Sequence, residues 1–204
     1  MTAEVFVTHV QVKLNRLDTN AYEDVRPEEV IFFANDALKL LTLGLDLGLY
    51  SQIVNKPAIM VYMADLIKIQ PELALTDNKV ALPASVLRLK GLEAFVVIGS
   101  ESGWMDTRAQ NNENNPDRES NTFLKSYPDT PNYRLIDGDI KFETQDNWNC
   151  TKVRYDYLAV PTEITDASTL VYPFMEELED KTVTLILENL EARRLQTQPS
   201  VSKS

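Results

Sequence analysis

Cysteine and histidine are almost absent from this chain of 204 residues, which contains one of each, Cys150 and His9. A single cysteine excludes an intramolecular disulfide. Structural zinc sites need several cysteine and histidine ligands, so these two residues cannot build one without carboxylates. A chain of this length buries enough surface on folding to be stable without such cross-links. The sequence therefore predicts a fold held by packing, with no metal.

Glycine is also scarce, with six residues in the chain, and no glycine-rich phosphate-binding loop is present. Gly44 and Gly48 lie four residues apart, but the Lys-Ser or Lys-Thr pair of a P-loop does not follow them. Asp137 and Asp139 flank a glycine without the third acidic ligand and the later glutamate of a calcium loop. We predict a turn there, and no cofactor.

Basic residues are outnumbered, at 20 against 31 acidic residues, which gives a net charge of -11. Arg193 and Arg194 are the only adjacent basic pair in the sequence. Nucleic-acid binding draws its affinity from clustered lysine and arginine, so we predict no sequence-specific DNA binding. The first interpretation is an acidic, solvated surface. The second is an acidic wall lining a channel through which DNA slides without sticking.

Long apolar runs are missing as well. The longest, near residues 59–69, is interrupted by Asp65 and Lys68 and is too short to span a membrane. The first residues lack the basic region and apolar core of a signal peptide. We therefore expect no membrane contact.

Three amphipathic helices are predicted. The first follows Thr2, a favourable N-cap. The second, at about 27–43, begins with Pro27 and two glutamates, which suit the positive end of a helix. The third, at about 174–195, opens with the acidic run 176–180, which we interpret as complementing the helix dipole. The apolar stripes that define the three helices are Phe6, Val10, Leu14 and Leu17; Val30, Phe33, Ala34, Ala37, Leu38 and Leu41; and Leu178, Val183, Leu187, Leu190 and Arg194.

The middle of the chain carries strand signals. Residues 73–75 and 80–82 flank a Thr-Asp-Asn-Lys turn and are predicted to pair as a hairpin that Pro83 ends. Residues 86–98 predict a further strand with an interruption at Gly91.

A second hairpin is the clearest in the chain. An Asp-Gly pair at 137–138 supplies the positive φ values of a tight turn between residues 133–136 and 140–142. Residues 153–157 then alternate apolar and polar side chains, which is typical of a half-buried strand, and Pro161 ends it.

Three segments are harder to interpret. Residues 41–49 alternate leucine with other residues, which suggests an extended segment, although leucine favours helices. Residues 57–69 fit either a short helix or a strand. Residues 103–132 are strongly polar and too long for a simple connector, so we predict an extended polar loop insertion. The fold class is α+β: a small helical scaffold of two N-terminal helices and a C-terminal helix, with a β-hairpin-rich middle, in one domain of residues 1–204.

No catalytic constellation emerges from the sequence. His9 lies on the flank of the first helix, where we expect a partly buried side chain paired with a backbone carbonyl. A nucleophile such as Cys150 would join it only if the fold brought the two together. The acidic residues offer many pairs for glycoside hydrolysis, and none stands out. Trp104 and Trp148 suit a sugar-binding platform, but packing is the commoner use of aromatic residues. We predict that the protein is not an enzyme and has no catalytic, cofactor-binding or metal residues.

Three parts of the chain carry a family resemblance. They are residues 26–41 (RPEEVIFFANDALKLL), residues 73–83 (LALTDNKVALP), and the end of the chain from residues 153–157 (VRYDY) through Pro161 to the helix at 177–190. They resemble the second helix, the turn with its Leu-Pro step, and the closing strand, loop and helix of tailed-phage head-to-tail connector, or adaptor, proteins. The chain is most similar to the ring proteins of crAss-like short-tailed phages. The resemblance covers most of the chain in its order of elements, but the loop at 103–132 departs from the smaller adaptors.

The resemblance implies a structural subunit of a ring, usually dodecameric, that is stacked below the portal, supports tail attachment and leads the genome into the tail. The implied partners are copies of the chain itself, the portal protein, other connector or tail proteins, and passing genomic DNA that is bound without sequence specificity. The implied location is the virion, at the head–tail junction or in the tail, after assembly in the host cytoplasm. The family has no catalytic residues to carry over.

Two other functions stay open. A tail-associated carbohydrate- or receptor-binding protein would expose tryptophan and bind glycans saturably. A carboxylate hydrolase would contain one aspartate or glutamate whose alanine variant folds but loses activity.

Overall fold

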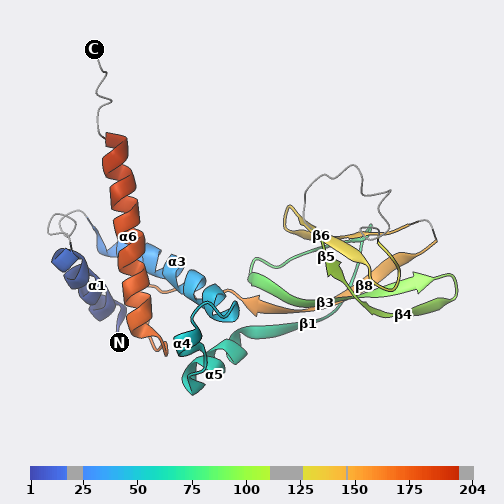
Figure 1. The fold of residues 1–204 in the computed structure, drawn as a ribbon, viewed down its shortest axis with the longest axis horizontal. Coiled ribbons are helices and arrows are strands. Elements are labelled where there is room, and N and C mark those ends of the chain that lie inside the picture. The colour runs from blue at the N-terminus through green and yellow to red at the C-terminus, as the bar shows by residue number, and fades with distance from the viewer. Residues whose placement is uncertain (18–24, 111–125, 146, 198–204) are drawn as a thin grey trace, which may run out of the picture. The chain divides into compact units, whose positions relative to one another are not determined.

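Figure 1 shows the fold of the computed structural model, which describes residues 1–17, 25–110, 126–145 and 147–197. The chain divides into two compact units. Met1–Leu66 together with Pro161–Ser204 form a helical unit, and Ile67–Val160 form a β unit inserted between those two segments. The predicted α+β class, with helices at both ends and a β-rich middle, is confirmed. Residues 1–204, which we expected to form one domain, separate into these two units.

Helix α1 (Ala3–Leu17) begins after Thr2, as predicted. The Thr2 hydroxyl oxygen accepts a hydrogen bond from the Val5 N–H at 3.4 Å, which satisfies one of the unpaired donors of the first turn. The predicted stripe is buried except for Leu17, which is 68% exposed. Leu17 is the last residue of the helix, at the end of the stripe. The buried residues of α1 are Ala3, Phe6, Val7, Val10 and Leu14.

Helix α3 (Pro27–Asp46) runs three residues past its predicted end. Its start is held by a carboxylate oxygen of Glu29, which accepts a hydrogen bond from the Arg26 N–H at 3.2 Å. The alternating leucines are therefore mainly helical, and the chain turns at Gly48, whose φ is 72°. The buried residues follow the predicted stripe, with Phe33 half-buried: Val30, Ala34, Ala37, Leu38, Leu41, Thr42, Gly44 and Leu45.

The ambiguous segment 57–69 contains both a helix and a strand. After the short helix α4 (Ser51–Val54), helix α5 (Pro57–Leu66) ends where strand β1 (Ile67–Ala74) begins. Every residue of α5 is described, and Ile59 alone is buried. A single apolar stretch thus changes conformation at the boundary between the two units.

Helix α6 (Met175–Thr197) agrees closely with its predicted bounds. Leu178, Val183 and Leu190 are buried as expected. Ile186, which the predicted stripe left out, is 1% exposed, whereas Leu187 is half-buried.

The helical unit packs α1, α3 and α6 around one core that includes Phe6, Leu38, Leu178 and Ile186. Asn35 on α3 binds the segment that leads to α6. Its side-chain amide donates to the Ile164 carbonyl at 3.0 Å, and its carbonyl oxygen accepts from the Ile164 N–H at 2.7 Å. Both polar groups of a half-buried amide are thereby satisfied.

In the described part of the β unit, the strands form two four-stranded sheets. The first sheet has the order β1-β8-β3-β4 and is antiparallel throughout. The second has the order β2-β7-β6-β5, with β5 parallel to β6. The bounds of these strands are β2 Lys79–Ala81, β3 Val86–Ile98, β4 Glu101–Asp106, β5 Arg108–Ala109, β6 Asn132–Ile136, β7 Asp139–Glu143 and β8 Asn149–Ala159.

The core of the β unit is a second apolar cluster, to which both sheets contribute. Alternate residues of β3 and β8 are buried on one side, as the period of a strand requires. The cluster consists of Leu92, Ala94, Val96, Ile140, Phe142, Trp148, Cys150, Val153 and Tyr155.

The hairpin prediction at residues 73–82 was wrong in its pairing. Asp77 and Asn78 do form a tight turn, with φ values of 52° and 59°. However, Leu73 pairs with Val153 on β8, whereas Val80 pairs with Ile140 on β7. The turn passes the chain from one sheet to the other, because each flanking strand finds a longer partner elsewhere.

The other strand predictions agree with the structure. Asp137 and Gly138 have φ values of 53° and 84° and join β6 to β7 as the expected hairpin. Strand β3 has the expected irregularity, between Leu89 and Gly91.

The expected loop at residues 103–132 begins with ordered structure. Residues 103–106 belong to β4, and residues 108–109 form β5. Residues 111–125 lie outside the described residues, as does the turn that we expected at 18–20.

Candidate functional site

The residues that the sequence raised as chemical candidates lie in different surroundings. His9 is on α1 in the helical unit, and Cys150 is on β8 in the β unit. The Cys150 thiol is buried, and burial raises its pKa to about 12. At neutral pH the thiol is therefore protonated, which makes it a poor nucleophile.

His9 is part of a charged cluster between α1 and α6. Its Nδ1 atom lies 3.0 Å from a carboxylate oxygen of Glu179, rather than near the backbone carbonyl that we expected. Lys13 Nζ lies 2.9 Å from the other Glu179 oxygen and 2.6 Å from Asp180. The Glu179 side chain is only 10% exposed, so its charge needs these partners.

The same cluster shifts the pKa of Lys13. Partial burial would lower this pKa, but hydrogen bonds to Asp180 and Glu179, together with the attraction of their charges, outweigh burial and raise it. The predicted acidic run at the start of α6 thus has a structural partner on α1 as well as the helix dipole.

The two tryptophans do not share a surface. Trp148 is 4% exposed and belongs to the core of the β unit. Trp104 is partly exposed on β4, where the Arg154 guanidinium carbon lies 4.5 Å from its ring centroid. Phe95 meets the Trp104 ring edge-on, with ring centroids 5.4 Å apart. An exposed platform in this unit would have to be built on Trp104 without Trp148.

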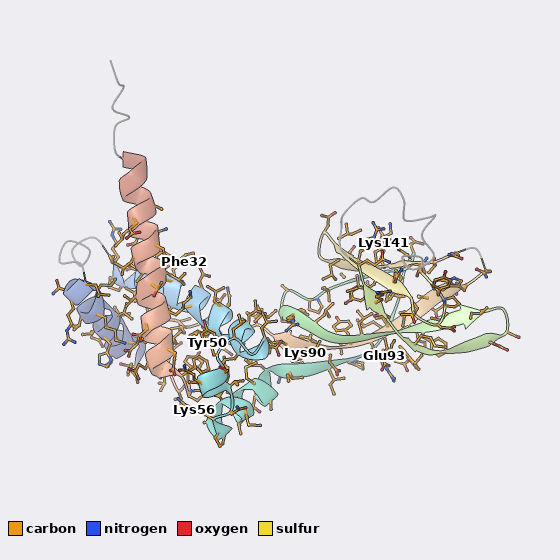
Figure 2. The ribbon with its side chains drawn as sticks, viewed as in Figure 1. Phe32, Tyr50, Lys56, Lys90, Glu93 and Lys141 are labelled. Carbon is orange, nitrogen blue, oxygen red and sulfur yellow. The ribbon has the colours of Figure 1, made fainter. Side chains whose placement is uncertain are left out.

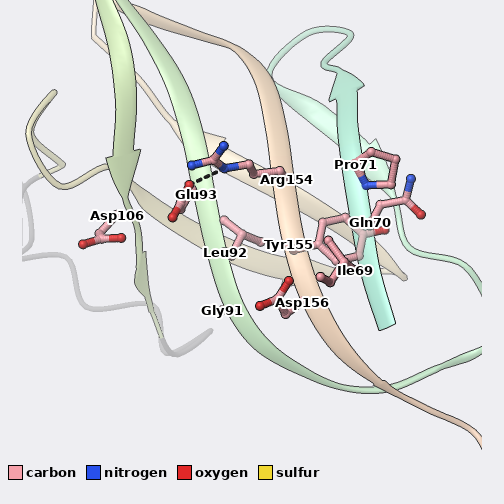
Figure 3. Close-up of a pocket in the computed structure, with 10 residues that line it drawn as sticks. All are labelled: Ile69, Gln70, Pro71, Gly91, Leu92, Glu93, Asp106, Arg154, Tyr155 and Asp156. Carbon is pink, nitrogen blue, oxygen red and sulfur yellow. Dashed lines mark hydrogen bonds and ion pairs between the residues drawn. The ribbon is translucent and has the colours of Figure 1, made fainter. Parts of the chain in front are cut away.

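A hollow of about 330 Å³ lies on the first sheet, and Figure 3 shows the side chains around it. Glu93 and Arg154 form an ion pair there, with Asp106 and Asp156 nearby. Gly91 contributes no side chain, and nothing lies within 4 Å of the position that its Cβ would occupy. The lining residues are Ile69, Gln70, Pro71, Gly91, Leu92, Glu93, Asp106, Arg154, Tyr155 and Asp156.

Metal binding finds no support among the residues that the structure describes. Nowhere in those ranges do three or more histidine, cysteine, aspartate or glutamate side chains gather closely enough to hold an ion. The Asp137–Gly138 pair forms a turn, as predicted. Within the same ranges, none of the helices combines the length and apolar character needed to cross a bilayer.

On the side of α3 that faces away from the core, exposed apolar side chains are interspersed with the charged Asp36 and Lys39. Phe32, Leu40 and Leu47 recur at spacings of eight and seven residues, which places them on one side of the helix. Their exposed fractions are 63%, 45% and 48%, and Leu49 in the following turn is 72% exposed. Figure 2 labels Phe32 on this helix. We call Phe32, Leu40, Leu47 and Leu49 the α3 apolar surface.

Helix α5 adds exposed apolar side chains to the same unit. Met60 is 59% exposed and Val61 is 63% exposed. Single exposed apolar residues are ordinary on soluble proteins, but grouped ones mark sites of contact with another molecule. The candidate functional site is therefore the α3 apolar surface, whose exposed side chains are of the kind found at protein contacts.

The sequence contained a signal for this surface that we did not use. Phe32 and Leu40 on α3 and its C-cap residue Leu47 lie eight and seven residues apart, outside the predicted stripe. A helix with two apolar sides packs on its own core with one and leaves the other for a partner.

A scan against protein-family models finds no match for this chain, and a search of curated proteins finds none either.

Proposed function

We propose that this protein is a structural subunit of a ring in a virion head-to-tail connector, placed below the portal, where it supports tail attachment and genome passage. The α3 apolar surface is the observation that carries the proposal. Leaving four large apolar side chains in water is unfavourable, and a neighbouring subunit that covered them would recover roughly 25 cal/mol for each Å² removed from water. A subunit of a permanent assembly has such a neighbour at all times.

A closed ring imposes a requirement on the surface of each copy. Each copy in a ring must present two different surfaces, one to each neighbour, because the contact is heterologous. The helical unit exposes apolar residues on α3 and on α5. Two such surfaces on one unit suit a subunit with a neighbour on each side.

The order of elements and the charge also support the proposal. Helices before a β-rich middle and a closing helix after it follow the order of elements in the connector proteins that the sequence resembles. A net charge of -11 opposes tight binding of the phosphate backbone. A ring through which DNA must pass benefits from that repulsion.

Quantitative mass spectrometry of purified particles of the encoding virus tests this function. We expect a copy number equal to that of the portal protein or a small multiple of it. Absence of the chain from the particle would overturn the proposal, and glycan-binding and hydrolase assays would then be the next measurements.

A variant pair tests the surface itself. Phe32→Asp combined with Leu40→Asp places charge on the α3 apolar surface and should block incorporation of the chain into particles while the purified protein stays folded. Val171→Asp is the matched control, because Val171 is an apolar residue of the same unit that is 82% exposed and lies outside α3. Normal incorporation of the double variant would show that this surface is not the contact.

A further inference from the structure

Three basic side chains form a row across the second sheet of the β unit. Lys79 on β2 pairs directly with Lys141 on β7, and Lys141 pairs directly with Arg134 on β6. Directly paired residues point to the same face, and adjacent strands lie about 4.8 Å apart. Figure 2 labels Lys141 within this sheet. We call Lys79, Lys141 and Arg134 the cationic row.

Like charges placed directly opposite each other destabilise a sheet. Glu143 compensates one member of the row by forming an ion pair with Arg134. Lys79 and Lys141 are exposed, and neither has an ion-pair partner among the residues that the structure describes. In a chain with a net charge of -11, two adjacent lysines without a direct ion pair are available to a partner that supplies the opposite charge.

A matching pair of carboxylates is exposed on α6. Glu188 and Glu191 are three residues apart on the helix, so they lie about 5–6 Å from each other on one side. Neither has an ion-pair partner in the described ranges. The spacing of this acidic pair is close to the spacing between the two free lysines of the cationic row.

We propose that Lys79 and Lys141 of one copy bind Glu188 and Glu191 of a neighbouring copy. The proposal rests on the proposed ring, whose heterologous contact requires two different surfaces that complement each other. Opposite charges at matched spacing would set the register between copies, while the α3 apolar surface would supply the larger share of the affinity.

A phosphate backbone fits the cationic row less well. Affinity for nucleic acid comes from many clustered basic residues, whereas the row is flanked along β7 by Asp139 and Glu143 on the same face. The net charge of the chain also repels a polyanion at longer range. An acidic surface of limited size, such as the pair on α6, is the better complement.

The test uses the full chain and measures its molar mass by light scattering over a range of concentrations. The variants are Lys79→Glu with Lys141→Glu, Glu188→Lys with Glu191→Lys, and all four changes together. Each double variant should weaken self-association about tenfold, because attraction becomes repulsion. The fourfold variant should recover it, because complementarity returns with the signs exchanged.

Two controls accompany the variants. Lys68→Glu changes the net charge as much as Lys141→Glu does, but at an exposed lysine on the other sheet, so it should leave association unchanged. Raising the ionic strength from about 0.1 M to about 1 M shortens the Debye length from about 10 Å to about 3 Å and should weaken association of the wild type.

Three results would overturn this contact. They are a wild-type chain that stays monomeric at its highest soluble concentration, association that ignores both charge reversals, and duplex DNA binding that Lys79→Glu with Lys141→Glu abolishes while association persists. None of these contradicts the ring, which the copy number in the particle tests separately. Loss of association in the double variants and recovery in the fourfold variant would support the contact.

Discussion

The helical unit and the β unit differ in the kinds of side chain that they expose. The helical unit has 17 acidic and 9 basic residues, and the β unit has 14 and 11. The more acidic unit is nevertheless the one that exposes the α3 apolar surface, whereas the β unit exposes the cationic row. The comparison indicates that the two units use different physical forces for contact: removal of apolar area from water in one, and charge complementarity in the other.

The variant with the largest expected effect tests whether the two units unfold separately. Phe174 is 1% exposed in the core of the helical unit, so Phe174→Ala should lower the free energy of unfolding by about 3–5 kcal/mol. Both tryptophans belong to the β unit and all described helices to the helical unit. The midpoint of urea unfolding followed by far-ultraviolet circular dichroism should therefore move to a lower urea concentration. The midpoint followed by tryptophan fluorescence should stay unchanged.

Phe142→Ala is the counterpart in the β unit, where Phe142 is 2% exposed. It should shift the fluorescence transition and leave the circular dichroism of the helices unchanged. Equal shifts of both signals in either variant would show that the two units unfold in one cooperative transition. The helical unit and the β unit would then not be independent folding units.

The next effect concerns the charged cluster that joins α1 to α6. Glu179→Ala removes the shared partner of His9 and Lys13 and should cost about 1–3 kcal/mol in thermal or urea unfolding. Glu188→Ala, an exposed position on the same helix, should change stability by less than about 0.5 kcal/mol. A similar loss in both variants would mean that the contacts of Glu179 with His9 and Lys13 do not explain the result.

This cluster also gives a dependence on alkaline pH. The pKa of Lys13 is raised in the folded protein, so its contribution is complete below the ordinary lysine pKa and is lost as pH rises through the raised value. The stability difference between the wild type and Lys13→Met should therefore shrink at strongly alkaline pH.

A smaller effect comes from the start of α3. The hydrogen bond from the Arg26 N–H is the main cause that lowers the pKa of Glu29, and Arg193 adds to it. Glu29→Gln should cost about 0.5–1 kcal/mol at neutral pH. A carboxyl group whose pKa is lowered by folding stabilises the folded protein at pH values above its ordinary pKa, and this stabilisation is lost as the pH falls. The unfolding free energies of the wild type and Glu29→Gln should therefore become equal in acid. A difference that persisted in acid would point to packing instead of charge.

The smallest effect on stability is expected at the α3 apolar surface. Phe32→Ser should change the unfolding free energy of the isolated chain by less than about 0.5 kcal/mol, because the ring is mostly in water already. The same variant should weaken association measured by light scattering. A clear loss of stability would mean that Phe32 belongs to the internal packing of the helical unit.

The accuracy of the sequence predictions followed the range of the interactions involved. The helix at 27–43 and the Asp137–Gly138 hairpin were predicted because caps, stripes and turns are local properties. The pairing of residues 73–75 was not, because the turn at Asp77 does not determine which distant strand each flanking segment joins. The change from helix to strand after Leu66 was equally hidden, since an apolar run without periodicity fits both.

The two candidate surfaces also differ in how much of each could be predicted from the sequence. The α3 apolar surface lies on α3 and on the turn that directly follows it, so its spacing was available in the sequence. Lys141 and Arg134 are brought together by the hairpin that the sequence predicted. Lys79 joins them only because β2 adds to that hairpin from a distant part of the chain, and no local pattern shows this.

The strands that enter and leave the β unit are direct neighbours. Ile67, the first residue of β1, pairs with Leu158 near the end of β8, so the chain leaves the helical unit and comes back through two points that are about 4.5–5.5 Å apart. A segment attached in this way can be gained, lost or exchanged during evolution without opening the fold that hosts it. The β unit is therefore an insertion in the helical unit, and a short linker from Leu66 to Pro161 would replace it.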